Sequence, residues 1–494
     1  MAQTDEVAGD RLSDWISLGV LASWVSRDAV DEAVEVTGKA AKRRGGKLPP
    51  QVMVYFVMGL APFAEEDYEE VWTRITETLA GWGCWDDSQA DVTTGGITQA
   101  RQRLGHEPVK ETFAQVARPV ATLETEGAFL GPWRKMSIDG LEWDVPGTKA
   151  NAAEFGYPGA GKDGVPAAFP KARAVTIGEC ASHAPVLAAI GPCVSKGSGE
   201  QSLARELYPR LEEDWLLIAD RNFYNWQDWC TAADTGAALL RRVKADLTLQ
   251  PLEFYRDGSY RSVLVNPKVR GGARQKLIDA ARAGENLDPA RARHVRVVEY
   301  EVPDRDGDGD GKDEIIALIT TIAAWTDAPA PVLGAAYHER WEHETGNKQV
   351  KTFLRGPGKI LRSQSPDMVK QEIWGYFLTH YAVTALICTA ATNAGIDPDR
   401  VKFKRAIRII RRAGNPAFPP EQHKRLLGHV MADITDPRKL NTKRERSYPP
   451  VVKRARHNSY RVKKPGQHGT RHDAPATIKL VNPALTRDNT RIAA

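Results

Sequence analysis

The segment from Tyr337 to Lys351 constrains this chain more than any other, because it places four different functional groups at helical spacing. It reads YHERWEHETGNKQVK, and the steps between Tyr337, Arg340, Glu344 and Lys351 are three, four and seven residues. With about 3.6 residues per turn, an α-helix would keep the four side chains on one narrow face. The carboxylate can bind a divalent cation, and the other three groups can bind phosphate. Taken alone, the spacing equally fits a solvent-exposed helix face with an Arg340–Glu344 pair.

Length and composition limit the class of protein. The chain has 494 residues, of which 42% are hydrophobic and 27% are charged, as expected for a soluble globular protein of roughly two to four domains. No apolar run approaches the ~18 residues of a membrane span, and the polar, acidic N-terminus is not a signal peptide. We therefore expect an intracellular protein with no membrane partner. The five cysteines show no metal-binding spacing and are expected to be buried thiols.

Charge is spread unevenly along the chain. Residues 401–494 contain 23 Lys and Arg against 6 Asp and Glu, although the net charge of the whole chain is only +5. A basic tail on a mildly acidic body indicates a polyanionic partner, most simply nucleic acid. A solubilising, partly disordered tail is the alternative, because the region mixes Arg, Lys, Pro and Tyr without apolar periodicity from about Asn441.

The first part of the chain is expected to be helical. Residues 11 to about 80 carry apolar side chains at helical spacing, and residues 92–119 are typical of two short helices around a turn at Gly105. The first of these two helices has a basic edge at Arg101 and Arg103. Such an edge fits a DNA-binding helix, and plain helical packing fits it nearly as well.

From Trp133 onward the pattern changes to strands alternating with helices, which predicts an α/β layer. A β-rich insertion of about residues 245–330 interrupts this layer. Within it, the sequence DRDGDGDGKDE that begins at Asp304 lacks the final carboxylate of a calcium-binding loop at the required position. We interpret it as a hairpin turn between two strands.

Three carboxylates are candidates for metal-dependent phosphodiester chemistry. Asp139 is predicted to close a strand at Ile138, Asp220 follows a strand that ends at Ala219, and Glu344 lies on the helix described above. Cleavage or transfer at a phosphodiester needs hard oxygen ligands that hold two Mg²⁺ ions about 3.5–4 Å apart. Each Asp alone is more often a turn cap, but the ordered set with Arg340 and Lys351 fits this chemistry well.

These motifs resemble the insertion-sequence 4 family of DDE transposases. The family's Tyr-x2-Arg-x3-Glu-x6-Lys signature is matched in full by the segment that ends at Lys351. Its Ile-Asp-Gly strand end corresponds to residues 138–140, and its Ala-Asp-Arg-Gly-Phe-Tyr motif to residues 219–224, with Asn222 in place of Gly. The resemblance covers roughly residues 11–400.

The resemblance implies an RNase H-like α/β catalytic core with a β-rich insertion, preceded by an all-helical N-terminal domain and followed by a helical, basic C-terminal tail. The expected boundaries are 11–125 for the N-terminal DNA-binding domain, 130–400 for the catalytic domain with its insertion at about 245–330, and 401–494 for a basic, partly disordered C-terminal region.

The resemblance also implies a function. It predicts Mg²⁺-dependent cut-and-paste transposition with end nicking, hairpin formation and strand transfer, with two Mg²⁺ ions (or Mn²⁺) held by Asp139, Asp220 and Glu344. Tyr337, Arg340 and Lys351 would bind DNA. The partners would be double-stranded DNA, at the terminal inverted repeats and the target, and a second copy of the chain in a synaptic homodimer. The expected location is the bacterial cytoplasm, at the nucleoid. A catalytically inactive, transposase-derived DNA-binding protein and a plain nuclease are the alternatives.

Overall fold

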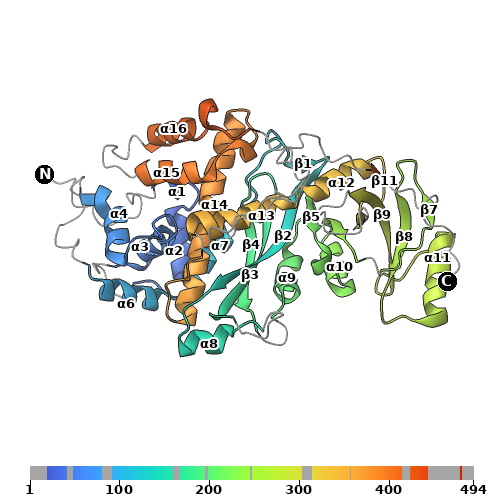
Figure 1. Cartoon of the computed structure of the whole chain (residues 1–494), viewed down its shortest axis with the longest axis horizontal. Coiled ribbons are helices and arrows are strands. Elements are labelled where there is room, and N and C mark those ends of the chain that lie inside the picture. Colours follow the sequence, from blue (N-terminus) through green and yellow to red (C-terminus); the bar gives the residue numbers. More distant parts are fainter. Residues whose placement is uncertain are drawn as a thin grey trace, which may run out of the picture. The chain divides into compact units, whose positions relative to one another are not determined.

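The computed structural model describes most of the chain, and its elements are labelled in Figure 1. The described residues are 19–41, 48–80, 92–159, 167–194, 198–244, 247–302, 314–356, 358–413, 423–442 and 479–480. They fall into two compact units. Unit 1 comprises residues 1–215 and 339–441, and unit 2 comprises residues 216–338 and 442–494.

Unit 1 begins with a group of short helices, as the apolar periodicity predicted. These are α1 (Gly19–Ala22), α2 (Arg27–Val36), α3 (Pro50–Gly59), α4 (Tyr68–Ala80), α6 (Thr94–Leu104) and α7 (Glu107–Val116). The predicted turn at Gly105 is confirmed. Its φ of 71° lies in the left-handed region that glycine adopts without steric cost. Residues 11–18 lie outside the described residues.

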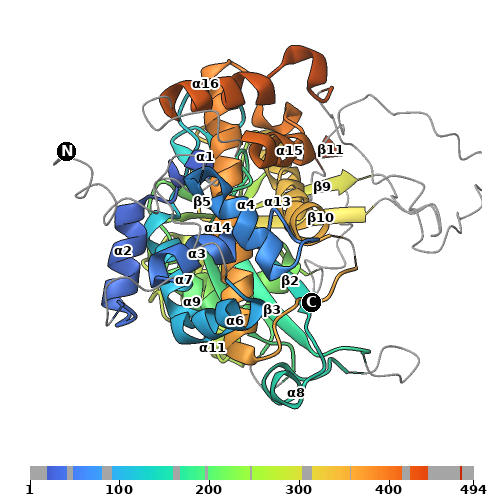
Figure 2. The same ribbon diagram turned by 90° about the vertical axis from the view of Figure 1, so that its left-hand side faces the viewer.

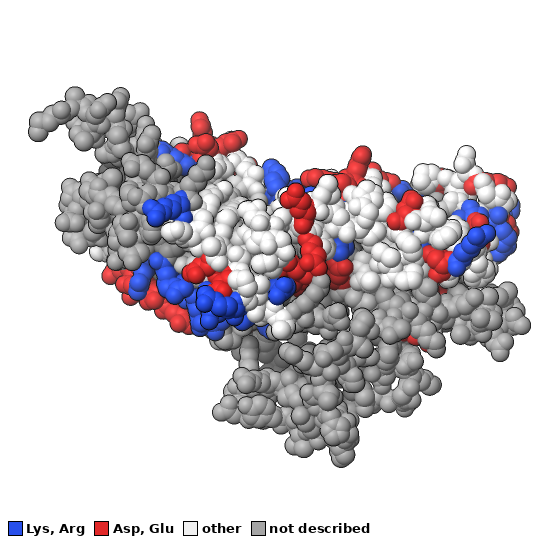
Figure 3. Space-filling model, turned by 90° about the horizontal axis from the view of Figure 1, so that it is seen from above, with Lys and Arg blue, Asp and Glu red and all other residues white. Residues whose placement is uncertain are grey.

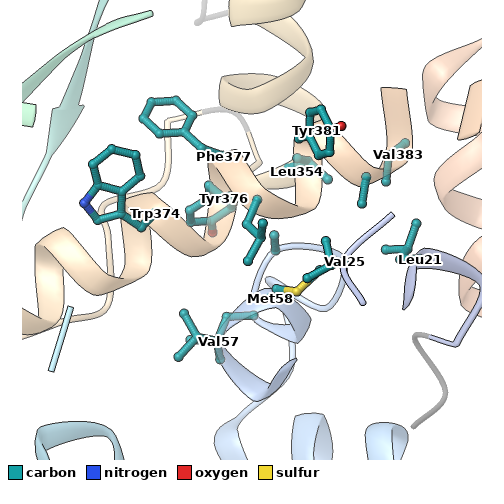
Figure 4. Packing of buried hydrophobic residues seen from close by; sticks show 14 of the residues in the cluster. Leu21, Val25, Val57, Met58, Leu354, Trp374, Tyr376, Phe377, Tyr381 and Val383 are labelled. Atoms are coloured by element: carbon teal, nitrogen blue, oxygen red, sulfur yellow. The ribbon is translucent and has the colours of Figure 1, made fainter. Parts of the chain in front are cut away.

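The centre of unit 1 is the 28-residue helix α14 (Pro366–Asn393). Its side chains pack against α1 and α3 in one hydrophobic cluster, which Figure 4 shows around Met58 and Phe377, and Figure 2 shows α14 running between the other helices of the unit. A Cβ atom at Gly375 would lie 2.8 Å from the carbonyl oxygen of Val57, so glycine permits this close approach to α3.

Helix α14 also corrects an expectation about membranes. By length and composition it could cross a membrane, although the sequence analysis found no such run. In the structure, 94% of its most apolar window is buried inside the protein, as in the core helix of a soluble protein. Two helices of the basic C-terminal region, α15 (Phe403–Ala413) and α16 (His423–Ile434), contribute buried side chains to the same cluster.

The sheet of unit 1 is antiparallel, in the order β4-β3-β2, with β1 paired to β2. Its elements are β1 (Phe129–Leu130), β2 (Trp133–Asp144), β3 (Lys171–Glu179) and β4 (Pro185–Pro192), and the remaining helices of this part are α8 (Lys149–Phe155), α9 (Glu200–Leu207) and the 3₁₀ turn η2 (Tyr208–Arg210). The prediction that Asp139 closes a strand is wrong. Strand β2 continues through Asp139 and Gly140, because β3 pairs with it along its whole second half and Asp139 lies opposite Thr176.

Unit 2 contains a mixed sheet. Strand β5 (Trp215–Ala219, whose first residue belongs to unit 1) pairs with β6 in parallel, and the order continues antiparallel as β6-β10-β9-β8-β7, with β11 paired to β9. The elements after β5 are η3 (Arg221–Phe223), α10 (Trp226–Ala233), β6 (Ala238–Arg242), β7 (Glu253–Phe254), β8 (Tyr260–Val265), α11 (Gly271–Ala283), β9 (Ala292–Val302), β10 (Glu314–Thr320), α12 (Ala330–His338) and β11 (Lys479–Leu480).

The β-rich texture expected for residues 245–330 is present, together with the helix α11, which the sequence analysis did not name. Strands β9 and β10 pair antiparallel, as the hairpin interpretation requires, and residues 303–313 between them lie outside the described residues. The mixed α/β class is therefore confirmed. The domain boundaries at residues 125–130 and 400 stay predictions.

The cysteines partly follow the expectation of buried thiols. Cys180 and Cys388 are buried, and burial raises the pKa of each thiol to about 12. Cys193 and Cys230 are only half-buried, and all four of these described cysteines are free. Cys84 lies outside the described residues.

The expected basic edge of α6 is only half present. The side chain of Arg101 is 0% exposed, because its guanidinium donates to Gln371 Oε1 at 2.9 Å and to Ser363 Oγ at 3.1 Å, and also bonds to Tyr68. The prediction that Arg101 contacts DNA is therefore wrong: it ties α6 to α14. Arg103 is exposed, and its DNA contact stays a prediction.

Replacing Arg101 by Ala should lower the free energy of unfolding by about 3 kcal/mol, because hydrogen bonds to a charged group are lost and buried partners are left unpaired. The matched variant Arg103→Ala, on the exposed side of the same helix, should change it by less than about 0.5 kcal/mol. Urea unfolding followed by circular dichroism measures both. Equal effects of the two variants would contradict this role of Arg101.

Candidate active site

The segment from Tyr337 to Lys351 is not one regular helix. Helix α12 ends at His338, α13 (Trp341–Lys348) follows a two-residue turn, and η4 (Gln349–Leu354) continues it as a π-helix. The expectation of one helical face for all four signature residues is therefore wrong. The boundary between the units also falls within the segment, so that Tyr337 belongs to unit 2 and the other three residues to unit 1.

The buried side chain of His343 fixes α13 to the sheet of unit 1. Its Nδ1 lies 2.9 Å from Ser137 Oγ on β2, and its Nε2 lies 2.8 Å from Thr176 Oγ1 on β3. Burial is the main cause that lowers the pKa of His343, to about 4, so the ring is neutral at pH 7. A neutral ring offers one N–H donor and one bare nitrogen, and the two hydroxyls satisfy both. The two hydrogen bonds therefore fix the rotation of α13 about its own axis.

In this orientation, one face of α13 contacts Asp139. Side chains alternate along a strand, so Asp139 shares the face of β2 on which Ser137 bonds to His343. Its Oδ2 accepts from Asn347 Nδ2 at 3.1 Å, and its Oδ1 accepts from the backbone N–H of Gly140 at 2.9 Å. Asn347 follows Glu344 by three residues, and residues at this spacing are neighbours on a helix surface. The structure thus brings the Glu344 face of α13 to Asp139.

The charged signature residues of unit 1 lie around this face. Arg340 Nη2 is 3.5 Å from Glu344 Oε1, and the Glu344 side chain is 42% exposed. Lys351 is half-buried. Burial and the charge of Arg355 lower its pKa, while the negative charges of Glu142 and Asp139 oppose this shift. The charge of Asp139 therefore acts on Lys351, although Lys351 lies in the π-helix and not in α13.

On the opposite face of β2, close packing against Glu200 explains why a glycine follows Asp139. A Cβ atom at Gly140 would lie 2.2 Å from Glu200 Oε1, at the start of α9. Further along the strand, Glu142 accepts from Arg173 at 2.8 Å and pairs with Lys171 at 3.4 Å. The bond to Arg173 and the charge of Lys171 outweigh burial and lower the pKa of Glu142.

Asp220 lies in unit 2, directly after β5, as predicted. It begins the turn η3, and its Oδ1 accepts from the backbone N–H of Asn222 at 2.7 Å. The buried guanidinium of Arg241 on the neighbouring strand β6 donates to the carbonyl of Phe223 at 2.8 Å and so anchors this turn. In the same unit, Tyr337 is only 5% exposed, and its ring contacts His338. Its DNA contact stays a prediction.

Three residues of the site were missed by sequence reasoning, which named none of His343, Asn347 and Arg241 as functional. Asn347 could have been found from the sequence, because a polar side chain three residues after Glu344 shares its helix face. His343 and Arg241 act through partners that are distant in the sequence, which no local pattern reveals.

A small cavity lies beside the site in unit 1, lined by residues that include His183, His343, Asn347 and His380. His380, on α14, is 2% exposed, and its Nε2 donates to Gln349 Oε1 at 2.9 Å. Burial, with smaller effects from His183 and His343, lowers the pKa of His380 to about 3. His380 is therefore neutral in the folded protein and ionises only at strongly acidic pH.

This pKa predicts a loss of stability in acid. Below the ordinary value of 6.5 the unfolded chain binds a proton at His380 that the folded chain does not, so the free energy of unfolding falls as pH falls from 6.5 toward 3. The contribution of this group is about 1.4 kcal/mol per pH unit. Urea unfolding at several pH values should give a shallower pH dependence for His380→Gln than for the wild type. The exposed control His429→Gln should keep the wild-type slope, and equal slopes in all three proteins would contradict the assignment.

Comparisons with known proteins show what this chain is similar to. Residues 15–114 match the family described as the N-terminal domain of insertion element 4 transposases. The chain is 25% identical over 448 residues to the transposase InsG for insertion sequence element IS4 of Escherichia coli (strain K12), and the match covers 88% of this chain and 91% of that protein.

A cryo-EM structure of a piggyBac transposase synaptic complex with hairpin DNA shows a weaker likeness. It has a TM-score of 0.41 at 10% identity, and the match covers 84% of this chain and 85% of that chain. The two sequence matches confirm the resemblance indicated by the motifs: the chain is similar to transposases of the insertion-sequence 4 family.

Proposed function

We propose that this protein is a transposase that cleaves DNA at the terminal inverted repeats of its insertion sequence and joins the ends to target DNA. Asp139, Asp220 and Glu344 would be the catalytic carboxylates. The observation that carries this proposal is the bond from Asn347 to Asp139, which brings the Glu344 face of α13 to the first of these carboxylates. The sequence matches to insertion-sequence 4 transposases support it.

The three carboxylates fit divalent metal ions of the Mg²⁺ class. All their donor atoms are oxygens, which Mg²⁺ prefers, and each of the three side chains is partly exposed. Two such ions, when bound, would activate the attacking hydroxyl and stabilise the leaving oxygen at phosphorus, and Mn²⁺ could replace Mg²⁺. The chain itself contributes the positions of the ligands: His343 fixes the rotation of α13, and Arg241 anchors the turn that begins at Asp220.

Cationic side chains would hold the DNA backbone. Arg340 and Lys351 flank Glu344 in the sequence and would bind the phosphates next to the cleaved bond, with Tyr337 positioning the terminal nucleotides. Arg103 and a row of exposed cations on α15 at positions 404, 408 and 412, spaced by one helical turn, would bind phosphates further away. Figure 3 displays one face of the protein, on which Lys and Arg side chains gather in a group at the lower left.

The reaction would proceed by nicking, hairpin formation, reopening of the hairpin and strand transfer, each an in-line displacement at phosphorus. A homodimer would hold two ends together. Residues 11–125 would form the DNA-binding domain and residues 130–400 an RNase H-like catalytic domain, acting on the bacterial nucleoid. A catalytically inactive DNA-binding protein is the second candidate, but the presence of all three carboxylates argues against it.

The test is Mg²⁺-dependent cleavage of labelled DNA that carries the terminal repeats of the element. The wild type should cut at the repeat boundary. Asp139→Asn and Glu344→Gln should each slow cleavage at least 100-fold, which is about 3 kcal/mol of activation free energy, while DNA binding measured by gel shift is retained. The matched control Asp279→Asn, on the exposed surface of α11, should cut like the wild type.

Binding of the repeats by the wild type with no cleavage in Mg²⁺ or Mn²⁺ would contradict catalysis and favour the inactive DNA-binding protein. Cleavage by Glu344→Gln at the wild-type rate would remove Glu344 from the proposed site and leave the transposase activity itself intact.

A further inference from the structure

A second group of potential metal ligands lies in unit 1 and contains neither Asp139 nor Glu344. His183 Nε2 is 3.1 Å from Glu342 Oε2 and 3.1 Å from Asp399 Oδ1, and one ligand atom of each residue lies within 4.8 Å of the others. His183 comes from the turn between β3 and β4, Glu342 from the first turn of α13, and Asp399 from the 3₁₀ helix η5 (Pro398–Arg400). The three side chains converge from three separate elements.

A proton on His183 explains this geometry poorly. Nε2 carries at most one hydrogen, which points in one direction, yet two carboxylates lie at the same distance. Each distance of 3.1 Å is longer than the ~2.7–2.9 Å of a charge-assisted N⁺–H···O⁻ bond. Donor atoms on one tetrahedral Zn²⁺, with metal–ligand distances of about 2.0–2.2 Å, are separated by roughly 3.4 Å. The two observed distances from His183 are close to the separation of ligands around a single ion.

The other ring nitrogen is held as in a metal-binding histidine. Gln349 Nε2 donates to His183 Nδ1 at 3.0 Å, and Gln349 Oε1 accepts from His380 Nε2. Nδ1 is therefore an acceptor and carries no proton. A metal cation on Nε2 is compatible with this arrangement, whereas a doubly protonated ring would direct its Nδ1–H at the N–H of Gln349.

The backbone at His183 is also strained. Its φ of 61° is in the left-handed region, and it is the single non-glycine with a positive φ among the residues that the structure describes. Such a conformation is unfavourable for a residue other than glycine and persists where the surroundings or a ligand compensate for it. It directs the imidazole toward α13 and η5.

We propose that His183, Glu342 and Asp399 form a binding site for one transition-metal ion of the Zn²⁺ class, with water as the fourth ligand. Imidazole together with carboxylates suits Zn²⁺ better than Mg²⁺, which prefers oxygen ligands alone. The ligand Glu342 precedes Glu344 by two residues, about 200° around the helix, so the site lies on the other side of α13 from the catalytic carboxylate. The ion would fix the start of α13 to the β3–β4 turn and to η5.

The test is metal binding by the metal-free, full-length chain, which does not depend on the proposed activity. Zn²⁺ is titrated in competition with a chromophoric chelator, and Co²⁺ is added separately to record its visible absorption. The wild type should bind one tight equivalent of Zn²⁺ and give the intense bands of four-coordinate Co²⁺. Asp399→Asn and Glu342→Gln should bind Zn²⁺ at least 10-fold more weakly, and so should Gln349→Leu, which removes the bond that orients His183.

Two controls separate this site from the catalytic one. Asp139→Asn and Glu344→Gln should keep the tight Zn²⁺ equivalent and the Co²⁺ bands. Absence of Co²⁺ bands in the wild type, a measurement that needs no variant, would overturn the proposal. Unchanged Zn²⁺ affinity in Asp399→Asn would also overturn it, and a proton on His183 would then be the cation that the two carboxylates hold.

Discussion

The rest of the candidate site depends on the two hydrogen bonds of the buried, neutral imidazole of His343, to Ser137 and to Thr176. They join α13 to two neighbouring strands and allow the helix one rotation, in which Asn347 bonds to Asp139. Loss of the ring would remove one hydrogen bond from each of these two buried hydroxyls and both bonds that fix the rotation of the helix. The position of Glu344 relative to Asp139 therefore depends on a residue that carries no catalytic group.

The same helix is held from its other side. Glu342 points to His183 and Asp399, and the π-helix after α13 places Gln349 between His183 and His380 on the core helix α14. Catalytic carboxylates must keep their positions to a fraction of an ångström when ions and DNA bind. A short helix anchored to a sheet, to a core helix and to a third element meets this need better than an exposed helix face would.

Local patterns predicted much of the fold and part of the site. The N-terminal helices, the glycine turn after α6 and the strand that ends before Asp220 follow from apolar periodicity and turn residues. The predictions that failed concern residues whose partners are distant in the sequence. Strand β2 continues through Asp139 because β3 pairs with it, and Arg101 is buried because Gln371, 270 residues away, accepts its hydrogen bond. The break of the helix at Glu339 and Arg340 coincides with the boundary between the two units, which the 3.6-residue period could not reveal.

The central claim, that Asp139, Asp220 and Glu344 hold common metal ions, is tested most directly by iron-directed cleavage of the chain. Fe²⁺ replaces Mg²⁺ in the complex with terminal-repeat DNA, hydroxyl radicals cut the backbone near the ion, and mass spectrometry maps the cuts. The Asp399→Asn variant serves as the background, so that iron at His183 does not contribute. The account predicts cuts near residues 139, 220 and 344 together, all abolished by Asp139→Asn. Cuts near 139 and 344 without any near 220, or an unchanged pattern in Asp139→Asn, would contradict it.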